Sequence, residues 1–338
     1  MTVFAWGLVG PGRIAHKFAE AVQRTPGMHL ARVQSRDAGR AEAFARRWAV
    51  DGRPAPQAGT DLAALLADPA IDAVYIATPH AQHAEAIEAA LHAGKPVLCE
   101  KPLVATAVQA ERVVALARKR GVFLMEALWS RFLPLYAAMR GWFGEGGLGA
   151  VCAVQASFAY PTRFDPADRQ WDPAAAGGAL LDLGIYPLAL TRWALEPAPG
   201  ACLAVTRSVV TGTLAPSGVD QRVHATLWFE GGAVAQFVSA LDHMGDNSLR
   251  ILGEQGAITV DQPFWGATRA RLSRLGQPDA ELVCPFEVNG FEYQVREAAR
   301  CVQAGLRECP GMPLAESLAL AHWLDDARRA VGVRYPFD

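Results

Sequence analysis

The sequence predicts an α/β fold of two domains: a doubly wound parallel sheet comes first, and an α+β domain with a large, mostly antiparallel open sheet follows it. Over the first third of the chain, hydrophobic strand-like runs alternate with amphipathic helix-like runs, which is the pattern of a parallel sheet covered by helices. After residue 129 most strand-like runs follow one another directly, as in an antiparallel sheet. The length of 338 residues suits about two domains.

Hydrophobic and amphipathic runs define the elements of the first domain. The hydrophobic runs predict strands over 3–9, 28–35, 71–77, 96–100 and 122–125. The amphipathic runs predict helices over 13–24, 38–48, 81–93 and 104–120. Thr60 and Asp61 begin a further short helix, because both residue types are favourable N-caps. We expect this domain to span residues 1–126.

The second domain begins with a predicted helix over 132–143, which leads through the loop 144–149 into strand-like sequence. Alternating hydrophobic residues predict strands over 151–158, 203–213, 223–229, 233–241 and 249–252. The pair Gly231 and Gly232 between two of these strands is typical of a hairpin turn. Further helices are predicted over 178–195, 291–304 and 313–331. We expect this domain to span residues 127–338.

Composition excludes several classes of partner. The formal net charge of −2 shows no basic excess, so nucleic acid is not an expected partner. No apolar run approaches the roughly 20 residues that span a bilayer, so no membrane partner is expected either. The first strand begins within a few residues of the N-terminus and leaves no room for a signal peptide. We therefore expect a cytoplasmic protein.

The six cysteines also favour a cytoplasmic location. None of them forms a CxxC pair, and no carboxylate–histidine cluster has the spacing of metal ligands. The sequence therefore predicts neither a metal site nor a disulfide framework, which fits a reducing cytoplasm.

A glycine turn lies between the first strand and the first helix, with the sequence Gly10-Pro11-Gly12-Arg13-Ile14-Ala15. This is the position that the dinucleotide-binding fingerprint requires. Gly10 permits the tight turn, and Gly12 lets the backbone approach a pyrophosphate closely. Free backbone N–H groups of the helix start, including those of Arg13 and Ile14, would hold the phosphates. The turn predicts a Rossmann domain that binds a nicotinamide dinucleotide; the alternative is a merely structural glycine turn.

The end of the second strand favours NADP over NAD. Arg36 can stack on the adenine and pair with a 2′-phosphate, and Ser35 and Arg40 can supply further donors. In the alternative interpretation both arginines are solvated, and Asp37 binds the ribose of NAD.

Two further groups of residues are candidates for catalysis. Glu100 and Lys101 lie at the carboxyl end of a predicted parallel strand, where open α/β sheets bind ligands. Pro102 restricts Lys101 to an extended conformation, although a solvated turn has the same sequence features. Asp182 and Tyr186 are four residues apart and share one face of the predicted helix. Tyr186 is alternatively a core tyrosine whose hydroxyl Asp182 anchors.

Taken in order, these motifs resemble those of the glucose–fructose oxidoreductase/inositol dehydrogenase family. The matching segments are GPGRIA, Ala77-Thr78-Pro79-His80 with His83, VLCEKP, and the segment from Gly177 to Tyr186. The segments 123–132 and 178–186 resemble more narrowly the branch that contains the trans-dihydrodiol dehydrogenases and the NADP-dependent xylose dehydrogenases. The resemblance covers nearly the whole chain.

The resemblance implies an NADP-dependent dehydrogenase that acts on an aldose such as D-xylose or on a trans-dihydrodiol. It implies that Thr78, Pro79, His83, Glu100 and Lys101 lie at the cofactor. It also implies a cis bond before Pro102 and a homodimer formed through the open sheet.

Catalysis is expected from Lys101, Tyr186 and Asp182. Many members of the family carry histidine where this chain has Tyr186, so either Tyr186 or Lys101 transfers the proton. An arrangement in which Lys101 stabilises a Tyr186 phenolate, with Asp182 orienting the tyrosine or the substrate, is preferred. The alternatives to this function are a catalytically idle, nucleotide-sensing regulator on the same fold and a ketosugar reductase that works in the opposite direction.

Aromatic and arginine side chains are candidates for contacts with a sugar or diol ring. The aromatic candidates are Trp129, Tyr160, Phe164 and Trp171, and the arginines are Arg131, Arg163 and Arg169.

Overall fold

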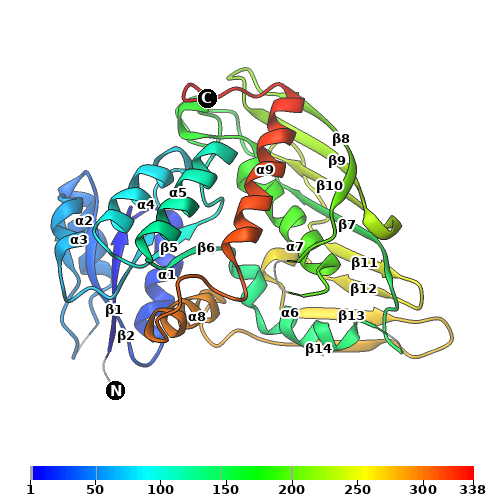
Figure 1. Cartoon of the computed structure of the whole chain (residues 1–338), viewed down its shortest axis with the longest axis horizontal. Helices are drawn as coiled ribbons and strands as arrows, with labels where there is room; N and C mark the ends of the chain where they lie inside the picture. Colours follow the sequence, from blue (N-terminus) through cyan, green and yellow to red (C-terminus); the bar gives the residue numbers. More distant parts are fainter. Residues whose placement is uncertain (1–2, 51, 145, 199–200) are drawn as a thin grey trace. The chain divides into compact units, whose positions relative to one another are not determined.

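The computed structural model describes residues 3–50, 52–144, 146–198 and 201–338, which form two compact units (Figure 1). The first unit comprises Met1–Trp129 and Glu287–Leu318, and the second comprises Ser130–Phe286 and Ala319–Asp338. The first division of the chain lies three residues beyond the expected boundary at residue 126. The return of residues 287–318 to the first unit differs from the linear division that the sequence predicted.

The first unit is built on a six-stranded parallel sheet with the order β3-β2-β1-β4-β5-β6. This is the strand order of the doubly wound dinucleotide-binding fold, and it confirms the predicted fold class. Residues of β1, β4 and β5 are almost all buried, because helices cover both faces of a parallel sheet. The strands are β1 (Phe4–Val9), β2 (Met28–Gln34), β3 (Gln57–Gly59), β4 (Ala73–Ile76), β5 (Val97–Glu100) and β6 (Leu124–Ala127).

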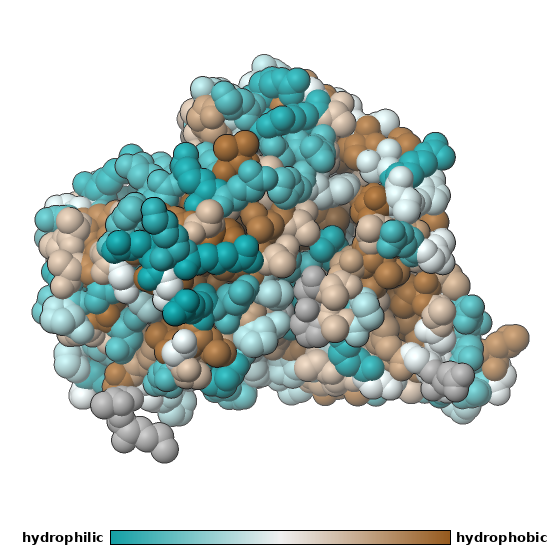
Figure 2. Space-filling view, in the orientation of Figure 1, coloured by the Kyte–Doolittle hydropathy of each residue, from teal (hydrophilic) through white to brown (hydrophobic). Residues whose placement is uncertain are grey.

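Three helices of the first unit begin at a short polar side chain that caps them. Asp37, Asp61 and Thr106 each accept a hydrogen bond from a backbone N–H in the first turn of α2, α3 and α5. The predicted short helix after Asp61 is thereby confirmed. Figure 2 shows mainly hydrophilic residues over α4 and α5. The helices are α1 (Arg13–Arg24), α2 (Ala38–Arg47), α3 (Leu62–Ala67), α4 (His83–His92) and α5 (Ala107–Arg120).

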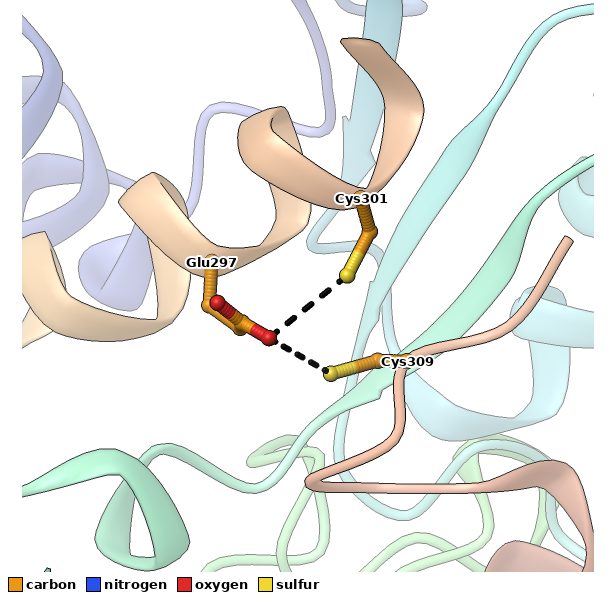
Figure 3. A group of neighbouring side chains, drawn as sticks. All are labelled: Glu297, Cys301 and Cys309. Carbon is orange, nitrogen blue, oxygen red and sulfur yellow. Dashed lines mark hydrogen bonds between the residues drawn. The ribbon is translucent and has the colours of Figure 1, made fainter. Parts of the chain in front are cut away.

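Helix α8 (Phe291–Gln303) belongs to the first unit although it follows the second unit in the sequence. It packs against α1, and the ring of Phe291 lies 5.0 Å from that of Trp129. The buried carboxylate of Glu292 accepts hydrogen bonds from the four backbone N–H groups of residues 287–290, so the loop before the helix is closely held. Its last turns carry Glu297 and Cys301, which with Cys309 form a group that we call the thiol cluster (Figure 3).

The second unit is built on an eight-stranded sheet with the order β14-β13-β12-β11-β7-β10-β9-β8. Only the pairing of β10 with β7 is parallel among these strands, so the predicted mostly antiparallel sheet is confirmed. The strands are β7 (Val151–Ala159), β8 (Val205–Leu214), β9 (Asp220–Phe229), β10 (Val234–Ala240), β11 (Leu249–Gly253), β12 (Ala257–Val260), β13 (Arg269–Ser273) and β14 (Ala280–Val283).

One face of this sheet packs on helices, and much of the other is exposed. The ring of Trp323 on α9 (Leu314–Val331) lies 5.3 Å from that of Phe237 on β10. Nearly every residue of the edge strand β8 is exposed, including Val209. Polar side chains such as Gln155 and Thr226 line a shallow hollow on the sheet. Figure 2 shows hydrophobic and polar residues intermixed over the strands of this unit.

The predicted helices of the second unit are present with altered bounds. The helix expected over 132–143 is divided into a 3₁₀ turn (Trp129–Phe132), α6 (Pro134–Met139) and a second 3₁₀ turn (Arg140–Trp142). The helix expected over 178–195 begins as a π-helical turn (Leu180–Gly184) and continues as α7 (Ile185–Leu195).

The stretch Pro173–Leu195 corrects one expectation. It is 23 residues long with a mean hydropathy of 1.3 in its most apolar window, so by length and composition it could span a membrane. Its window is 89% buried inside the protein, which is typical of a core helix.

Candidate functional site

Gly10 is required by the fold of the first unit. Its φ angle is +89°, and a Cβ atom there would lie 3.0 Å from the backbone of Ala77 and Thr78. The N–H group of Gly10 donates to the carbonyl of Gln34 at 3.0 Å. The glycine turn is thereby fixed between the carboxyl ends of β2 and β4.

Gly12, in contrast, is not required by its protein surroundings. It has an ordinary φ of −84° and is the N-cap of α1, where no described side chain caps the helix. A Cβ atom there would meet only the carbonyl oxygen of Ala77, at 3.8 Å. Arg13 and Ile14 follow it and are exposed. The helix start thus offers unpaired N–H groups beside an open backbone, which suits an anionic group such as a pyrophosphate.

The carboxyl end of β2 presents arginines to solvent and uses its acid within the fold. Asp37 caps α2 by accepting the N–H of Arg40 at 2.9 Å. The buried hydroxyl of Ser35 accepts the N–H of Asp37 at 3.2 Å. The side chains of Arg36 and Arg40 are exposed. Asp37 therefore has a structural role here, while the two arginines remain accessible to a ligand.

Glu100 and Lys101 lie at the end of β5 as predicted. The buried Glu100 carboxylate accepts the hydroxyl of Tyr75 through Oε1 and the N–H of Lys101 at 3.2 Å through Oε2. The Tyr75 ring stacks on Phe18, with 3.8 Å between ring centroids. The bond between Lys101 and Pro102 is cis, which confirms that expectation. Lys101 is half-buried, and its backbone is held from the preceding residue.

His83 joins two strand ends. Its imidazole is completely buried, with Nδ1 2.9 Å from the carbonyl oxygen of Pro102 and Nε2 2.8 Å from that of Thr78. Burial lowers the pKa of His83, and the facing carbonyls oppose that shift. The contacts give His83 a positioning role for the turn that contains Lys101.

Thr78 and Pro79 are half-buried beside this turn. The Thr78 hydroxyl is buried and has no hydrogen-bond partner among the described residues, so it is available to a group brought in by a ligand.

Glu126 supports the same turn and was missed by the sequence analysis. Its buried carboxylate accepts the N–H of Leu103 at 2.8 Å through Oε1. Burial raises the pKa of Glu126 to about 7. A glutamate at the end of a strand carries no sequence signal that separates it from a solvated one.

Asp182 and Tyr186 lie on the central helix of the second unit, and both are about 8% exposed. Asp182 is in the π-helical turn, a feature that is frequent at functional sites, and Tyr186 is in the first turn of α7. The side-chain amide of Gln170 donates to Oδ2 of Asp182 at 2.9 Å and to the hydroxyl of Tyr160 at 2.8 Å. Nη2 of Arg169 is 3.6 Å from the same Asp182 oxygen. Gln170, which the sequence did not mark, thus fixes the carboxylate.

An aromatic group surrounds Tyr186. Its ring centroid lies 5.6 Å from that of Phe158 and 6.4 Å from that of Trp265. Phe158 and Trp265 are stacked at 3.5 Å. Neither was among the aromatic candidates.

The loop before Asp182 is held from two sides. Gly178 has a φ of +118° and lies against the buried Asp220, whose carboxylate accepts the N–H of Leu180 at 2.5 Å. Burial raises the pKa of Asp220 to about 7. The Tyr335 hydroxyl donates to the carbonyl of Gly177 at 3.0 Å.

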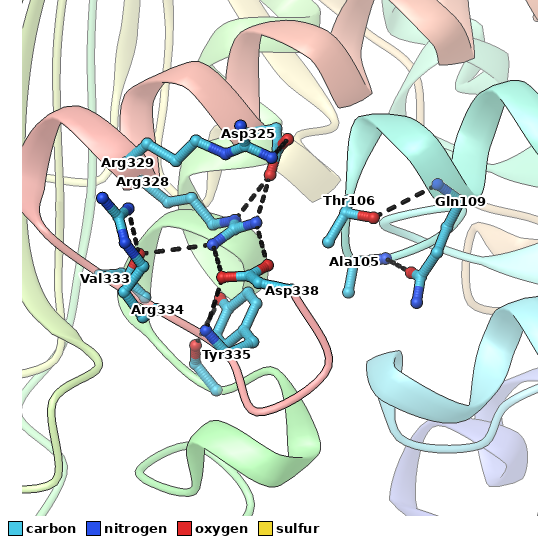
Figure 4. A network of polar contacts seen from close by, with 11 residues as sticks. Ala105, Thr106, Gln109, Asp325, Arg328, Arg329, Val333, Arg334, Tyr335 and Asp338 are labelled. Carbon is cyan, nitrogen blue, oxygen red and sulfur yellow. Dashed lines mark hydrogen bonds and ion pairs between the residues drawn. The ribbon is translucent and has the colours of Figure 1, made fainter.

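Tyr335 is itself held by a buried arginine near the C-terminus (Figure 4). Arg328 donates to the Asp338 carboxylate at 2.5 and 2.8 Å, and its guanidinium lies 4.7 Å from the centre of the Tyr335 ring. The chain terminus thereby buttresses the loop that carries Gly177.

Three of the side chains expected to contact a sugar or diol ring have structural roles instead. Arg131 is a correction: its side chain is 2% exposed and donates twice to the Glu196 carboxylate, at 2.8 and 3.0 Å. Trp129 is buried in the first unit against Phe291, and Trp171 is buried and donates to the carbonyl of Arg163. Of the four other candidates, Phe164, Arg163 and Arg169 are exposed, and Tyr160 is half-buried.

Both units contain a region that matches the model of a known protein family. Residues 4–128 match a family model described as an oxidoreductase family with an NAD-binding Rossmann fold. Residues 136–259 match the model of the GFO/IDH/MocA C-terminal domain.

Curated relatives match over the full length. The trans-1,2-dihydrobenzene-1,2-diol dehydrogenase of Mus musculus is 36% identical over 340 residues, covering 98% of each chain. The enzyme of the same name from Homo sapiens is 34% identical with the same coverage.

Two solved structures are also similar. A 3-ketoreductase from Actinomadura kijaniata, in complex with NADP and TDP-benzene, has a TM-score of 0.84 and 28% identity, covering 98% of each chain. An aldose-aldose oxidoreductase from Caulobacter crescentus, complexed with glycerol, has a TM-score of 0.82 and 25% identity, covering 97% of this chain and 98% of the other.

Proposed function

Because the chain belongs to the GFO/IDH/MocA family of oxidoreductases, and is a dehydrogenase that acts on CH–OH groups, we propose that it oxidises a vicinal diol with NADP⁺. The substrate is an aldose at its anomeric carbon or a trans-dihydrodiol. The observation that carries this proposal is Lys101 at the carboxyl end of β5, with its backbone bound to Glu100 and its turn bound to His83. A lysine held in this way is suited to act on a ligand at the strand ends.

The reaction transfers a hydride and a proton. A nicotinamide cofactor held at the glycine turn of Gly12 would supply the acceptor for the hydride that leaves the substrate carbon. Tyr186 accepts the hydroxyl proton, and the Lys101 ammonium stabilises the negative charge that develops on oxygen. Asp182, oriented by Gln170, accepts a hydrogen bond from the tyrosine or from a substrate hydroxyl. The alternative assignment gives proton transfer to Lys101 and leaves Tyr186 as a positioning group.

The preference for NADP is part of the proposal. Arg36 and Arg40 are exposed at the end of β2, where a 2′-phosphate would lie. Asp37, which would bind the ribose of NAD, already caps α2. The 3-ketoreductase of similar structure was crystallised with NADP.

We further propose a cytoplasmic homodimer. All six cysteines are free thiols, as in a reducing compartment. The edge strand β8 exposes Val205, Val209 and Leu214 on the open sheet, which suits association with a second copy. Light scattering on the purified protein is expected to give twice the mass of 36.2 kDa, and Val209→Glu is expected to give the monomer. Monomeric wild-type protein would contradict the dimer.

The name of the similar 3-ketoreductase supports a second candidate, reduction of a ketosugar in the opposite direction. The third candidate, an idle regulator, is less well supported, because such a protein has no need to keep Lys101 and Tyr186.

The deciding experiment follows NADPH absorbance with purified protein. NADP⁺ and NAD⁺ are each offered with D-xylose, D-glucose and trans-benzene dihydrodiol. We expect reduction of NADP⁺ that is lost in Lys101→Ala and kept in Lys119→Ala, a control lysine that is exposed on α5. NADPH binding without turnover on any pair, and without oxidation of NADPH by a ketosugar, would favour the regulator.

A further inference from the structure

The thiol cluster places three potential metal ligands together in the first unit (Figure 3). Glu297 and Cys301 are one helical turn apart on α8, and Cys309 comes from the loop that follows. The ligand atoms all lie within 4.8 Å of one another. Both thiols are completely buried, and the loop that carries Cys309 is closed by a hydrogen bond from the N–H of Met312 to the Cys309 carbonyl.

The spacing of these atoms matches one tetrahedral coordination sphere. With Zn–S bonds of about 2.3 Å and a Zn–O bond of about 2.0 Å, a tetrahedral zinc ion holds its sulfur and oxygen ligands about 3.5 Å apart. Oε1 of Glu297 lies 3.6 Å from Sγ of Cys301 and 3.8 Å from Sγ of Cys309. Each of these two oxygen–sulfur distances therefore needs to shorten by only a few tenths of an ångström.

Charge balance supports the same ion. Two thiolates and a carboxylate carry three negative charges, and a divalent cation leaves one. Arg300 supplies the balancing charge, because its guanidinium donates to both oxygens of Glu297, at 2.7 and 2.8 Å. Binding would release the two thiol protons to solvent, and a water molecule would complete the four ligands.

We propose that Glu297, Cys301 and Cys309 bind one soft divalent cation, Zn²⁺ in the first instance, as a structural site that ties the end of α8 to the loop carrying Cys309. Thiolate ligands select this class of ion over Mg²⁺ and Ca²⁺. The sequence predicts no metal site, because it has no CxxC pair and no carboxylate–histidine cluster with the spacing of metal ligands. Because Cys309 lies on a loop after α8, the three ligands come together only in the folded chain.

The test measures bound metal. Full-length protein is loaded with Zn²⁺, dialysed against metal-free buffer and analysed by mass spectrometry of the elements. Wild type and Cys152→Ser, a control at an exposed thiol outside the cluster, are expected to retain about one Zn²⁺ per chain. Cys309→Ser and Glu297→Gln are expected to lose most of it. Because Glu297→Gln changes a partly exposed side chain and preserves its size, it separates loss of metal from loss of folding.

A second measurement uses Co²⁺ as the probe. Wild type should show the thiolate-to-cobalt charge-transfer absorption and the intense visible bands of a tetrahedral site, and Cys301→Ser should show neither. Zn²⁺ should also raise the melting temperature of wild type and leave that of the Cys309→Ser variant unchanged. Retention of Zn²⁺ by the variants, no retention by wild type, or a Cys301–Cys309 disulfide in the purified protein would each overturn the proposal.

Discussion

The carboxylate of Asp220 occupies the space that any side chain at Gly178 would need. The same carboxylate accepts the N–H of Leu180 and so fixes the start of the π-helical turn that carries Asp182. Asp220 is therefore a positioning residue for the candidate catalytic helix, although it lies 38 residues beyond Asp182 in the sequence.

The raised pKa of Asp220 predicts a pH dependence of stability. Its folded pKa of about 7 exceeds the usual 3.8, so between about pH 4 and pH 7 the folded protein holds a proton that the unfolded chain has lost. The free energy of unfolding therefore falls as pH rises through this window, by roughly 4 kcal/mol at most from this group. Asp220→Asn removes this contribution. In thermal melts, the melting temperature of the variant should therefore rise relative to that of wild type as the pH is raised from 4 to 7.

The exposed Asp326 gives the matched control. Asp326→Asn should follow the pH profile of wild type. A constant difference between wild type and Asp220→Asn from pH 4 to pH 8 would show that Asp220 ionises normally in the folded protein.

The two glycines of the first turn should respond differently to alanine. Gly12→Ala meets only one atom, at 3.8 Å, so its melting temperature should match wild type while NADPH binding weakens by about tenfold or more, because the added methyl blocks a phosphate. Gly10→Ala is strained at a φ of +89° and should lower the melting temperature itself. Calorimetry of NADPH binding and thermal melts of both variants test this. Unchanged NADPH affinity in Gly12→Ala would place the phosphates elsewhere.

Arg36 should set the preference between the two nicotinamide cofactors. Loss of one charged hydrogen bond to a 2′-phosphate costs about 1.5–3 kcal/mol, so Arg36→Ala should raise the KM for NADP⁺ by roughly 10- to 100-fold. The KM for NAD⁺ should change little. Arg46→Ala removes an arginine of α2 that is 71% exposed and serves as the control. Equal effects on both cofactors would assign Arg36 to the adenine ring alone.

Removing the Tyr186 hydroxyl should affect the chemical step. We expect Tyr186→Phe to lower kcat by about 10²- to 10⁴-fold with a small change in KM, since general acid–base catalysis contributes in that range. The variant should also lose one limb of the pH–rate profile. Tyr160→Phe, which removes a hydroxyl that Gln170 binds, should have a smaller effect. If kcat falls less than tenfold in Tyr186→Phe, the proton carrier is Lys101.

Arg131 should matter for stability and not for substrate binding. Breaking a buried ion pair by removing one partner costs about 3–5 kcal/mol, so Arg131→Met should lower the melting temperature markedly. The remaining pair between Arg140 and Glu196, at 2.5 Å, moderates this loss. The KM for substrate should be unchanged. Adding Glu196→Gln to Arg131→Met should recover part of the stability. A raised KM together with an unchanged melting temperature in Arg131→Met would show instead that Arg131 contacts the substrate.

Much of the first unit could be predicted because its signals are local. Gly10, the cap at Asp61 and the hydrophobic runs of β1 and β4 each specify their own conformation. The strand β3 was missed, since its three residues, Gln57–Gly59, carry no hydrophobic pattern.

The strands β12, β13 and β14, at one edge of the second sheet, lack such local signals. In β13 the buried residues Ala270 and Leu272 alternate with the exposed Arg269 and Arg271. A run this short and charged does not stand out as a strand. β12 and β14 have only four residues each.

The partners of the candidate site residues could not be predicted for a different reason. Gln170 and Asp182, Arg131 and Glu196, and Leu103 and Glu126 are pairs that only the folded chain brings together. A sequence pattern reports which side chains are capable of a chemistry, whereas their use depends on neighbours that lie far away along the chain.

The return of residues 287–318 to the first unit has a consequence for synthesis on the ribosome. Domains generally fold in the order in which they emerge, with the N-terminal one first. Here α8, which packs against α1, emerges only after residues 130–286 have been translated. A nascent chain that ends before Phe291 leaves Trp129 without its aromatic partner and α1 without the helix that covers it. The nucleotide-binding unit therefore completes its folding only after residues 130–286 of the second unit have been made.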